Sequence, residues 1–147
     1  MKTVLIEIYS RDLLKLREEL NSYKEERSIW AIAGNISNSA GNLCLHLVGN
    51  LNHFIGAVLG NTGYVRKRED EFTSKNIPRS ELIFMIEKTR DMLLNILTVL
   101  NDADLENDFP VKYNDQTVRT DFMLMHLLAH LNYHLGQMNY HRRLTEK

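Results

Sequence analysis

Residues 125–137 read MHLLAHLNYHLGQ, and this stretch decides the expected fold. Its apolar residues Leu127 and Leu131 and the following Met138 recur at spacings that place them on one face of an α-helix. Its histidines recur every four residues, so they form a column on the same helix beside that apolar stripe. The stretch therefore predicts an amphipathic helix whose histidines face the protein interior or its rim.

Three further segments show the same apolar period and predict three more helices. The residues of their stripes are Leu5, Tyr9, Leu13, Leu16, Leu20 and Tyr23, then Leu43, Leu47, Leu51, Phe54 and Val58, and finally Leu82, Ile86, Thr89, Leu93, Leu97 and Leu100. Glycine is scarce and proline occurs only twice, which also favours helices. Four amphipathic helices of about 20 residues predict an all-α fold, a four-helix bundle in a single domain spanning residues 1–147.

Capping and helix-breaking residues set the expected helix boundaries. The first stripe fades near Arg27, and Ser37 and Ser39 are candidate N-caps of the second helix, which stops around residues 60–63. The third helix starts near Pro78 and ends at residues 101–104. Thr117 is a candidate cap of the fourth helix, which runs to about Arg143. Residues 61–77 and 102–117 are then long loops that permit crossover connections, with one extended piece expected at residues 110–113. The charge run RKREDEF at residues 66–72 is expected to be solvated surface.

The overall composition excludes several classes of function. The 18 Lys and Arg residues against 19 Asp and Glu leave a net charge of −1, so no basic field predicts nucleic-acid binding. No apolar run approaches the roughly 20 residues of a membrane helix. A single cysteine excludes an internal disulfide framework, and acidic Glu7 and Asp12 make the N-terminus unlike a signal peptide. A cytoplasmic protein is therefore expected.

The histidine column is the main candidate for chemistry. His130 and His134 leave one face of the helix a turn apart, a spacing at which two neutral imidazoles can share a divalent metal ion. His126 extends the column by one turn backwards, and Gln137 and His141 fall within the same arc of about 80°. The alternative interpretation is a group of neutral imidazoles that are crowded together and simply hydrogen-bonded.

The second predicted helix also carries histidines at the border of its buried stripe. His46 and His53 are seven residues apart and share a face, so either could add a third imidazole to the column. Three protein ligands plus an open position form a catalytic type of metal site, and histidine ligands suit zinc, nickel, iron or manganese. Cys44 lies about 160° around the helix from His46 and is expected to be a small buried residue.

Three segments of the chain resemble the DinB/YfiT-like superfamily of small metal-dependent enzymes. Residues 38–50, NSAGNLCLHLVGN, are similar to the second-helix segment in which such proteins place one histidine ligand. Residues 125–137 resemble the closing motif HxxxH followed by Gly-Gln, and residues 66–72 resemble an acidic-aromatic segment found in a subset of the family. The resemblance implies a four-helix bundle of the DinB/YfiT-like type.

The resemblance also implies the identity of the metal ligands, which are His46, His130 and His134. His126 and Gln137 would then be neighbours of the site. Many relatives carry a basic residue or a second histidine around the last ligand, where this chain has Tyr133 and Leu135. A substrate contact made by such a residue is therefore not expected here.

His53 is the rival ligand on the second helix. It lies about 10 Å beyond His46 along the helix axis, too far for both to hold one ion easily. We therefore expect His46→Ala to abolish tight metal binding and His53→Ala to leave it intact.

The resemblance implies a metal-dependent transferase or related enzyme that uses a low-molecular-weight thiol as cosubstrate. A divalent transition metal, with zinc or nickel favoured over iron or manganese, would hold the thiol as the nucleophilic thiolate. His126, Gln137 or His53 would orient the cosubstrate or move a proton, and a small molecule would be the substrate. No catalytic base can be named from the sequence.

Two other functions remain open. One is a non-catalytic dimeric metal-binding bundle with a structural or stress-related role, whose metal pins the second helix to the fourth. The other is a helical interaction module without a metal. The resemblance implies a homodimer, and the apolar residues Val4, Ile6 and Ile8 on the first helix support pairing without indicating which face pairs.

Overall fold

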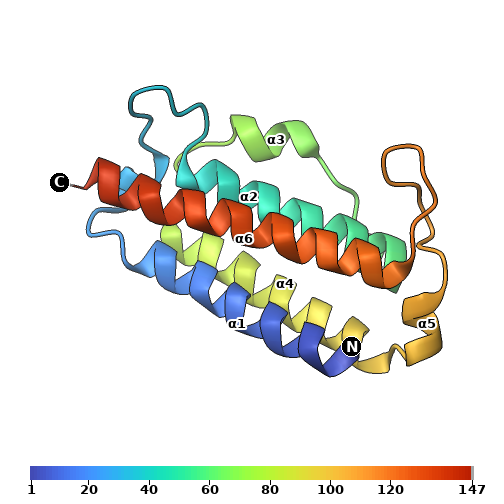
Figure 1. The fold of residues 1–147 in the computed structure, drawn as a ribbon. Coiled ribbons are helices and arrows are strands. Elements are labelled where there is room, and N and C mark those ends of the chain that lie inside the picture. The colour runs from blue at the N-terminus through green and yellow to red at the C-terminus, as the bar shows by residue number, and fades with distance from the viewer. Residues whose placement is uncertain (147) are drawn as a thin grey trace.

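The computed structural model describes residues 1–146, and over this range it is all-helical apart from two isolated β-bridges (Figure 1). The long helices are α1 (Lys2–Asn21), α2 (Ala40–Leu51), α4 (Arg79–Val99) and α6 (Thr120–Thr145). The shorter elements are the 3-10 helix η1 (Glu26–Trp30), the π-helical η2 (Asn52–Leu59), and the α-helices α3 (Arg68–Thr73) and α5 (Asp102–Glu106). The predicted all-α class is confirmed. None of these helices in residues 1–146 is both long and apolar enough to cross a membrane.

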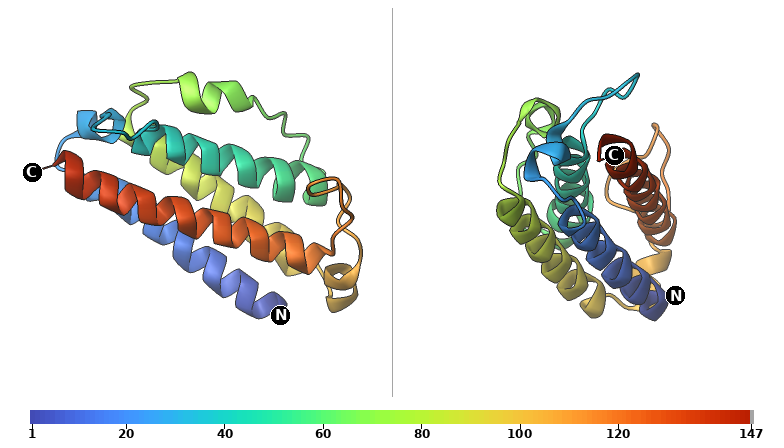
Figure 2. Two further views of the ribbon diagram at one scale, coloured as in Figure 1. Left: turned by 45° about the horizontal axis from the view of Figure 1, so that its top comes forward. Right: turned by 90° about the vertical axis from the view of Figure 1, so that its left-hand side faces the viewer.

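The four long helices lie side by side with their axes roughly aligned (Figure 2). α1 and α2 each pack against both α4 and α6. α2 with its continuation η2 runs in the same direction as α4, since Asn52 contacts Thr89 and Gly60 lies against Ile96 further along both helices. The chain between them therefore returns along the outside of α2, and α3 lies on this return path (Figure 1).

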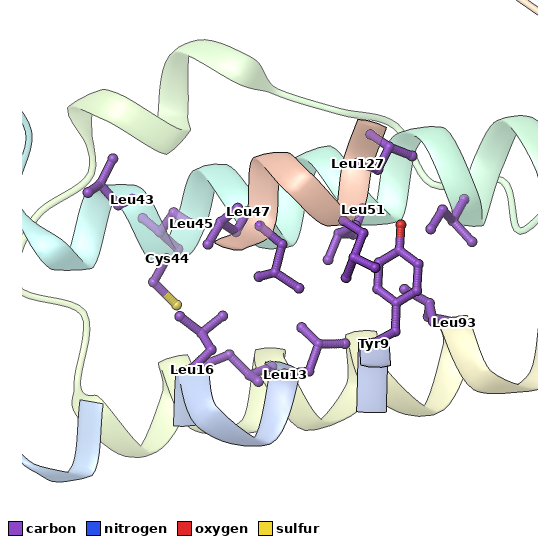
Figure 3. Packing of buried hydrophobic residues seen from close by; sticks show 14 of the residues in the cluster. Tyr9, Leu13, Leu16, Leu43, Cys44, Leu45, Leu47, Leu51, Leu93 and Leu127 are labelled. Carbon is purple, nitrogen blue, oxygen red and sulfur yellow. The ribbon is translucent and has the colours of Figure 1, made fainter. Parts of the chain in front are cut away.

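The core between the helices is built mainly from leucine. All six residues of the predicted α1 stripe are at most 1% exposed. Tyr9 and Leu13 point from α1 toward Leu47 and Leu51 of α2 (Figure 3). The Tyr9 hydroxyl donates a hydrogen bond to the Leu124 carbonyl oxygen, 2.6 Å away, so this ring is buried without an unpaired polar atom.

The second stripe is buried as predicted only as far as Leu51. Phe54 and Val58 are half-buried, whereas Ile55 and Gly56 are buried. The backbone changes to π-helical hydrogen bonding at Asn52, and a π-helix closes its hydrogen bonds over more residues than an α-helix. Each following residue is therefore carried to a different angle around the axis, and the α-helical register fails in η2.

Several helix boundaries agree with the prediction. Ser39 caps α2, and its hydroxyl oxygen accepts a hydrogen bond from the backbone N–H of Asn42 at 3.1 Å. η2 ends immediately before Gly60, and Pro78 precedes the first residue of α4.

The predicted cap of the last helix is wrong. α6 begins at Thr120 without a side-chain cap, and Thr117 lies in the preceding loop. In this loop Asp108 and Arg119 form an antiparallel bridge, and the Phe109 backbone N–H donates to the Val118 carbonyl oxygen at 2.8 Å. This pairing holds the chain extended up to Arg119 and so delays the start of the helix.

Each of the two predicted loops contains a short helix that the sequence did not indicate. Residues 101–104 are expected only to end the third helix, but Asn101 and Asp104 form a capping box that begins α5. α3 forms within the charge run expected to be solvated surface, and Glu71 within it is only 6% exposed. The solvated-surface prediction is therefore wrong for Glu71, because α3 packs its inner face on α2.

Candidate metal centre

Three histidine rings from two helices converge on one point between α2 and α6. Nε2 of His130 lies 3.1 Å from Nε2 of His46 and 3.0 Å from Nε2 of His134. One nitrogen of each ring lies within 4.8 Å of the others. Direct packing of α2 on α6 brings His46 to the two histidines of the column. The trio singled out in the sequence is therefore brought together by the fold.

Hydrogen bonds on the far side of two rings fix where their protons lie. Nδ1 of His46 is 3.0 Å from Oε1 of Glu71, and the carboxylate can only accept, so Nδ1 carries the proton. Nδ1 of His134 is 2.7 Å from the Gln137 side-chain oxygen, which also accepts. In the neutral rings, both Nε2 atoms are then unprotonated, and their lone pairs are available at the centre of the trio.

The three nitrogen atoms fit a divalent metal ion better than they fit one another. Nε2 of His130 can carry only one proton, so it cannot donate fully to both neighbouring lone pairs. Nδ1 of His130 is buried without a hydrogen-bond partner among the residues that the structure describes, so no contact prevents it from holding the proton instead. Two nitrogen ligands of a tetrahedral zinc ion lie about 3.3 Å apart, given bonds of about 2.0–2.1 Å. The two separations from Nε2 of His130, 3.1 Å and 3.0 Å, are close to this value.

Burial favours the neutral, metal-binding form of His46 and His130. Desolvation, helped by the neighbouring histidines, lowers the pKa of His130 to about 4. Desolvation also lowers the pKa of His46, although the hydrogen bond to Glu71 acts in the opposite direction. At neutral pH the rings of His46 and His130 are therefore in the neutral form and not imidazolium.

A buried ion pair supports His46 from outside the trio. Arg66 donates from Nε to Oε2 of Glu71 and from Nη2 to Oε1, both at 2.8 Å, which is the two-pronged geometry of strong Arg–carboxylate pairs. Nη2 of Arg66 also lies 3.3 Å from Nδ1 of His46, but both atoms are donors when Nδ1 carries the proton, so Arg66 acts on His46 through Glu71. The Phe72 ring packs against the His46 ring with 5.0 Å between centroids. All three supporting side chains come from the segment 66–72.

The sequence prediction missed Arg66 and Glu71 as parts of the site. They belong to the charge run at residues 66–72, which the sequence predicts to be solvated surface. One available signal was Phe72, an aromatic residue directly after Glu71 in an otherwise charged stretch. The resemblance noted for this acidic-aromatic segment pointed in the same direction.

The remaining predicted site residues have separate places. Gln137 contacts His134 as expected for a neighbour of the site. His126 is half-buried one turn before His130, with its ring 4.5 Å from that of Tyr113, and does not join the trio. His53 lies in η2 with its ring against Phe54 and is likewise outside the trio.

His141 and Cys44 have structural surroundings. Nδ1 of His141 accepts from the Tyr23 hydroxyl at 2.7 Å, and its Nε2 donates to the Ala31 carbonyl oxygen at 2.8 Å. This ring therefore ties α6 to Tyr23, just after the end of α1, and to the segment after η1. Cys44 is fully buried in the core, as predicted, and burial raises the pKa of its thiol to about 12.

A cavity of about 550 Å³ lies beside His134. It is formed between residues 35–38 and the C-terminal half of α6, where Tyr133, Gln137 and Tyr140 line it. None of its lining residues is Asp, Glu, Lys or Arg. Such a cavity suits an uncharged ligand group, because a charged one would be partly desolvated without a charged partner.

Comparison with known proteins gives a family without an assigned activity. The family model described as "Protein of unknown function (DUF1572)" matches residues 10–147, a range that includes the trio and the segment 66–72. No curated protein matches the chain.

Proposed function

This chain belongs to the DUF1572 family, and we propose that it is a metal-binding protein of the DinB/YfiT-like superfamily. Its ligands for a divalent transition metal would be His46, His130 and His134. The convergence of three Nε2 atoms, two with their protons fixed on the opposite nitrogen, carries this proposal. Four long helices with a long connection between parallel α2 and α4 support the DinB/YfiT-like bundle as the fold. Zinc and nickel are favoured, and iron or manganese would also accept imidazole ligands.

The proposed activity is that of a transferase, or a related enzyme, that uses a low-molecular-weight thiol as cosubstrate. A divalent ion held by three imidazoles keeps a position open and lowers the pKa of a water or thiol bound there. In the reaction, the thiol sulfur forms a bond to an electrophilic carbon of a small molecule. The bond from that carbon to its leaving group breaks, and the thiol proton passes to the leaving group or to water.

The chain's own residues supply orientation and space for this reaction. The side-chain oxygen of Gln137 accepts a hydrogen bond from Nδ1 of His134, and its amide nitrogen can donate to a ligand in the adjoining cavity. Tyr133 and Tyr140 line the same cavity and offer aromatic faces to an apolar part of the substrate. His126 and His53 lie outside the trio, so Gln137 is the favoured residue for contact with the cosubstrate.

A cobalt-substituted protein tests the proposed activity directly. We expect about one divalent ion per chain after purification without chelator, measured by mass spectrometry. Addition of a small thiol should change the visible absorption spectrum of the cobalt form, and conjugation of the thiol to an electrophile should require the metal. Absence of both effects with several bacterial thiols would exclude the thiol-dependent activity.

The alternative function is a non-catalytic metal-binding bundle with a structural or stress-related role. An ion shared by α2 and α6 would link the two helices and raise the melting temperature, because it binds only the folded state. This function predicts a large loss of thermal stability on metal removal and no spectral response to thiols. The cobalt experiment therefore separates the two functions.

A homodimer is also proposed, and the exposed surface of α6 supports it. Its exposed apolar side chains, between 47% and 66% accessible, are Phe122, Met125, Tyr133, Tyr140 and Leu144. By contrast, Ile6 and Ile8 of the first helix pack partly against their own core, although Val4 is exposed. The exposed row on α6 is therefore the favoured contact between two copies of this chain.

A further inference from the structure

We propose that Glu71, clamped by Arg66 and seated over Gly49, is a positioning residue that sets the metal affinity of the trio through His46. This inference rests on the proposed metal-binding function. It further means that docking of α3 on α2 and binding of the metal are coupled. The contacts of the carboxylate, the space that receives it and the attachment of α3 each support the proposal.

The Glu71 carboxylate has contacts that suit an orienting group for a metal ligand. Oε1 accepts from Nδ1 of His46 at 3.0 Å and from Nη2 of Arg66 at 2.8 Å, and Oε2 accepts from Nε of Arg66 at 2.8 Å. The side chains of Glu71 and Arg66 are 7% and 13% exposed, so the charge of each is balanced mainly by the other. A carboxylate held in this way fixes the His46 proton on Nδ1 and presents Nε2 to a metal.

Gly49 provides the space that the carboxylate occupies. It lies one turn after His46 in the interior of α2, where glycine lowers helix stability relative to alanine. A Cβ at this position would lie 2.6 Å from the Glu71 carboxyl carbon and still closer to Oε2. Any larger residue at position 49 would therefore displace the carboxylate from His46.

The contacts that attach α3 to α2 also hold Glu71 against His46. The Asn42 side-chain amide donates to the carbonyl oxygens of Glu71 at 3.0 Å and Ser74 at 2.8 Å, and Ser39 in turn donates to Asn42. Phe72 adds its ring against His46. Most other side chains of this six-residue helix are exposed. Because coupling between two binding events is reciprocal, a metal that needs His46 in place also holds α3 in place.

Metal affinity of matched variants tests the proposal. Zinc affinity would be measured by competition with a chromophoric chelator for the wild type, Glu71→Gln and the control Glu69→Gln, whose side chain is exposed on the same helix. We expect about a 10- to 100-fold loss of affinity for Glu71→Gln, the range seen when such outer partners of metal ligands are changed. Glu69→Gln should bind zinc as the wild type does.

A second pair of variants tests the space over Gly49 without removing the Glu71 carboxylate. Gly49→Ala should weaken zinc binding, whereas Gly136→Ala should not, because a Cβ at position 136 meets no atom within 4 Å. Circular dichroism of the metal-free proteins checks that both variants fold. In the cobalt form, Glu71→Gln and Gly49→Ala should change the visible spectrum, which a purely structural role would leave unaltered.

Hydrogen exchange tests the coupling in the opposite direction. In the wild type, zinc should slow amide exchange in residues 68–73, and this protection should be lost in Glu71→Gln. Wild-type zinc affinity, an unchanged cobalt spectrum and retained protection in Glu71→Gln would overturn the inference while the metal-binding function stands. A wild type that binds no zinc would instead overturn the proposed function, and this inference with it.

Discussion

Nε2 of His46 lies 3.1 Å from Nε2 of His130, although 84 residues separate the two histidines in the chain. This contact joins α2 to α6 at the candidate metal centre. Nε2 of His130 also lies 3.0 Å from Nε2 of His134, and its one proton cannot donate fully to both neighbouring nitrogens. The first prediction concerns which histidine of the second helix completes the site.

His46→Ala should lower zinc affinity by more than about 100-fold, since it removes a ligand rather than an outer partner. His53→Ala should leave the affinity unchanged, because His53 packs against Phe54 outside the trio. Isothermal titration of both variants measures the difference. Tight binding by His46→Ala together with weak binding by His53→Ala would reverse the assignment.

His141→Ala should destabilise the fold and leave the metal stoichiometry at the wild-type value. The variant loses buried hydrogen bonds to Tyr23 and Ala31 and leaves a cavity, which together cost about 2–4 kcal/mol of unfolding free energy. Urea denaturation measures this loss, with the half-buried His126→Ala as the milder control. A stable His141→Ala protein that no longer binds zinc would mean that His141 belongs to the metal site.

Asp12 should make the protein sensitive to acid. Burial alone would raise the pKa of this carboxyl, but hydrogen bonds from Arg11 and Asn132 outweigh it and hold the pKa below the ordinary value of 3.8. A lowered pKa in the folded state means that the ionised group stabilises the fold above about pH 4, and that this stabilisation is lost as the pH falls further.

The comparison with Asp12→Asn measures this contribution. The free energy of unfolding, followed by urea denaturation from pH 6 down to pH 2.5, should fall more steeply in the wild type than in Asp12→Asn. Parallel curves for the two proteins would show that Asp12 has the same pKa folded and unfolded. Zinc is left out of these samples, so that metal release does not contribute.

Tyr140→Glu should dissociate the proposed homodimer. The side chain is 66% exposed in the apolar row of α6, where a carboxylate would lose its hydration on pairing. Light scattering after gel filtration should give the monomer mass for Tyr140→Glu and the dimer mass for the wild type. Phe84→Glu, at an exposed apolar position on α4, is the matched control and should remain dimeric. A monomeric wild type would remove the dimer proposal.

The trio could be predicted because both of its helices follow a regular apolar period. His130 and His134 stand one turn apart beside Leu127 and Leu131, and such a border position faces a neighbouring helix in most packings. The resemblance then selected His46 over His53. Helical periodicity therefore predicts the part of the site that lies on long helices.

Glu71 and Arg66 could not be found in this way, since their positions depend on tertiary docking. Six residues of α3 are too few to show a period, and its inner face is defined only by the space over Gly49 and the capping contact of Asn42. His141 shows that the angle around a helix does not by itself place a residue in the site. Its angle around the helix matches that of the trio, but its distance along the axis places it beside Tyr23.

The parallel direction of α2 and α4 also determines how the candidate metal centre is shielded. A tight hairpin can join only antiparallel helices. Because α2 and α4 are parallel, the chain needs a long return segment between them. Here the return segment covers the outer side of His46 with Phe72 and the Arg66–Glu71 pair. This segment shields the ring of His46 from water on that side. A ligand of the proposed metal would therefore approach from the cavity beside His134.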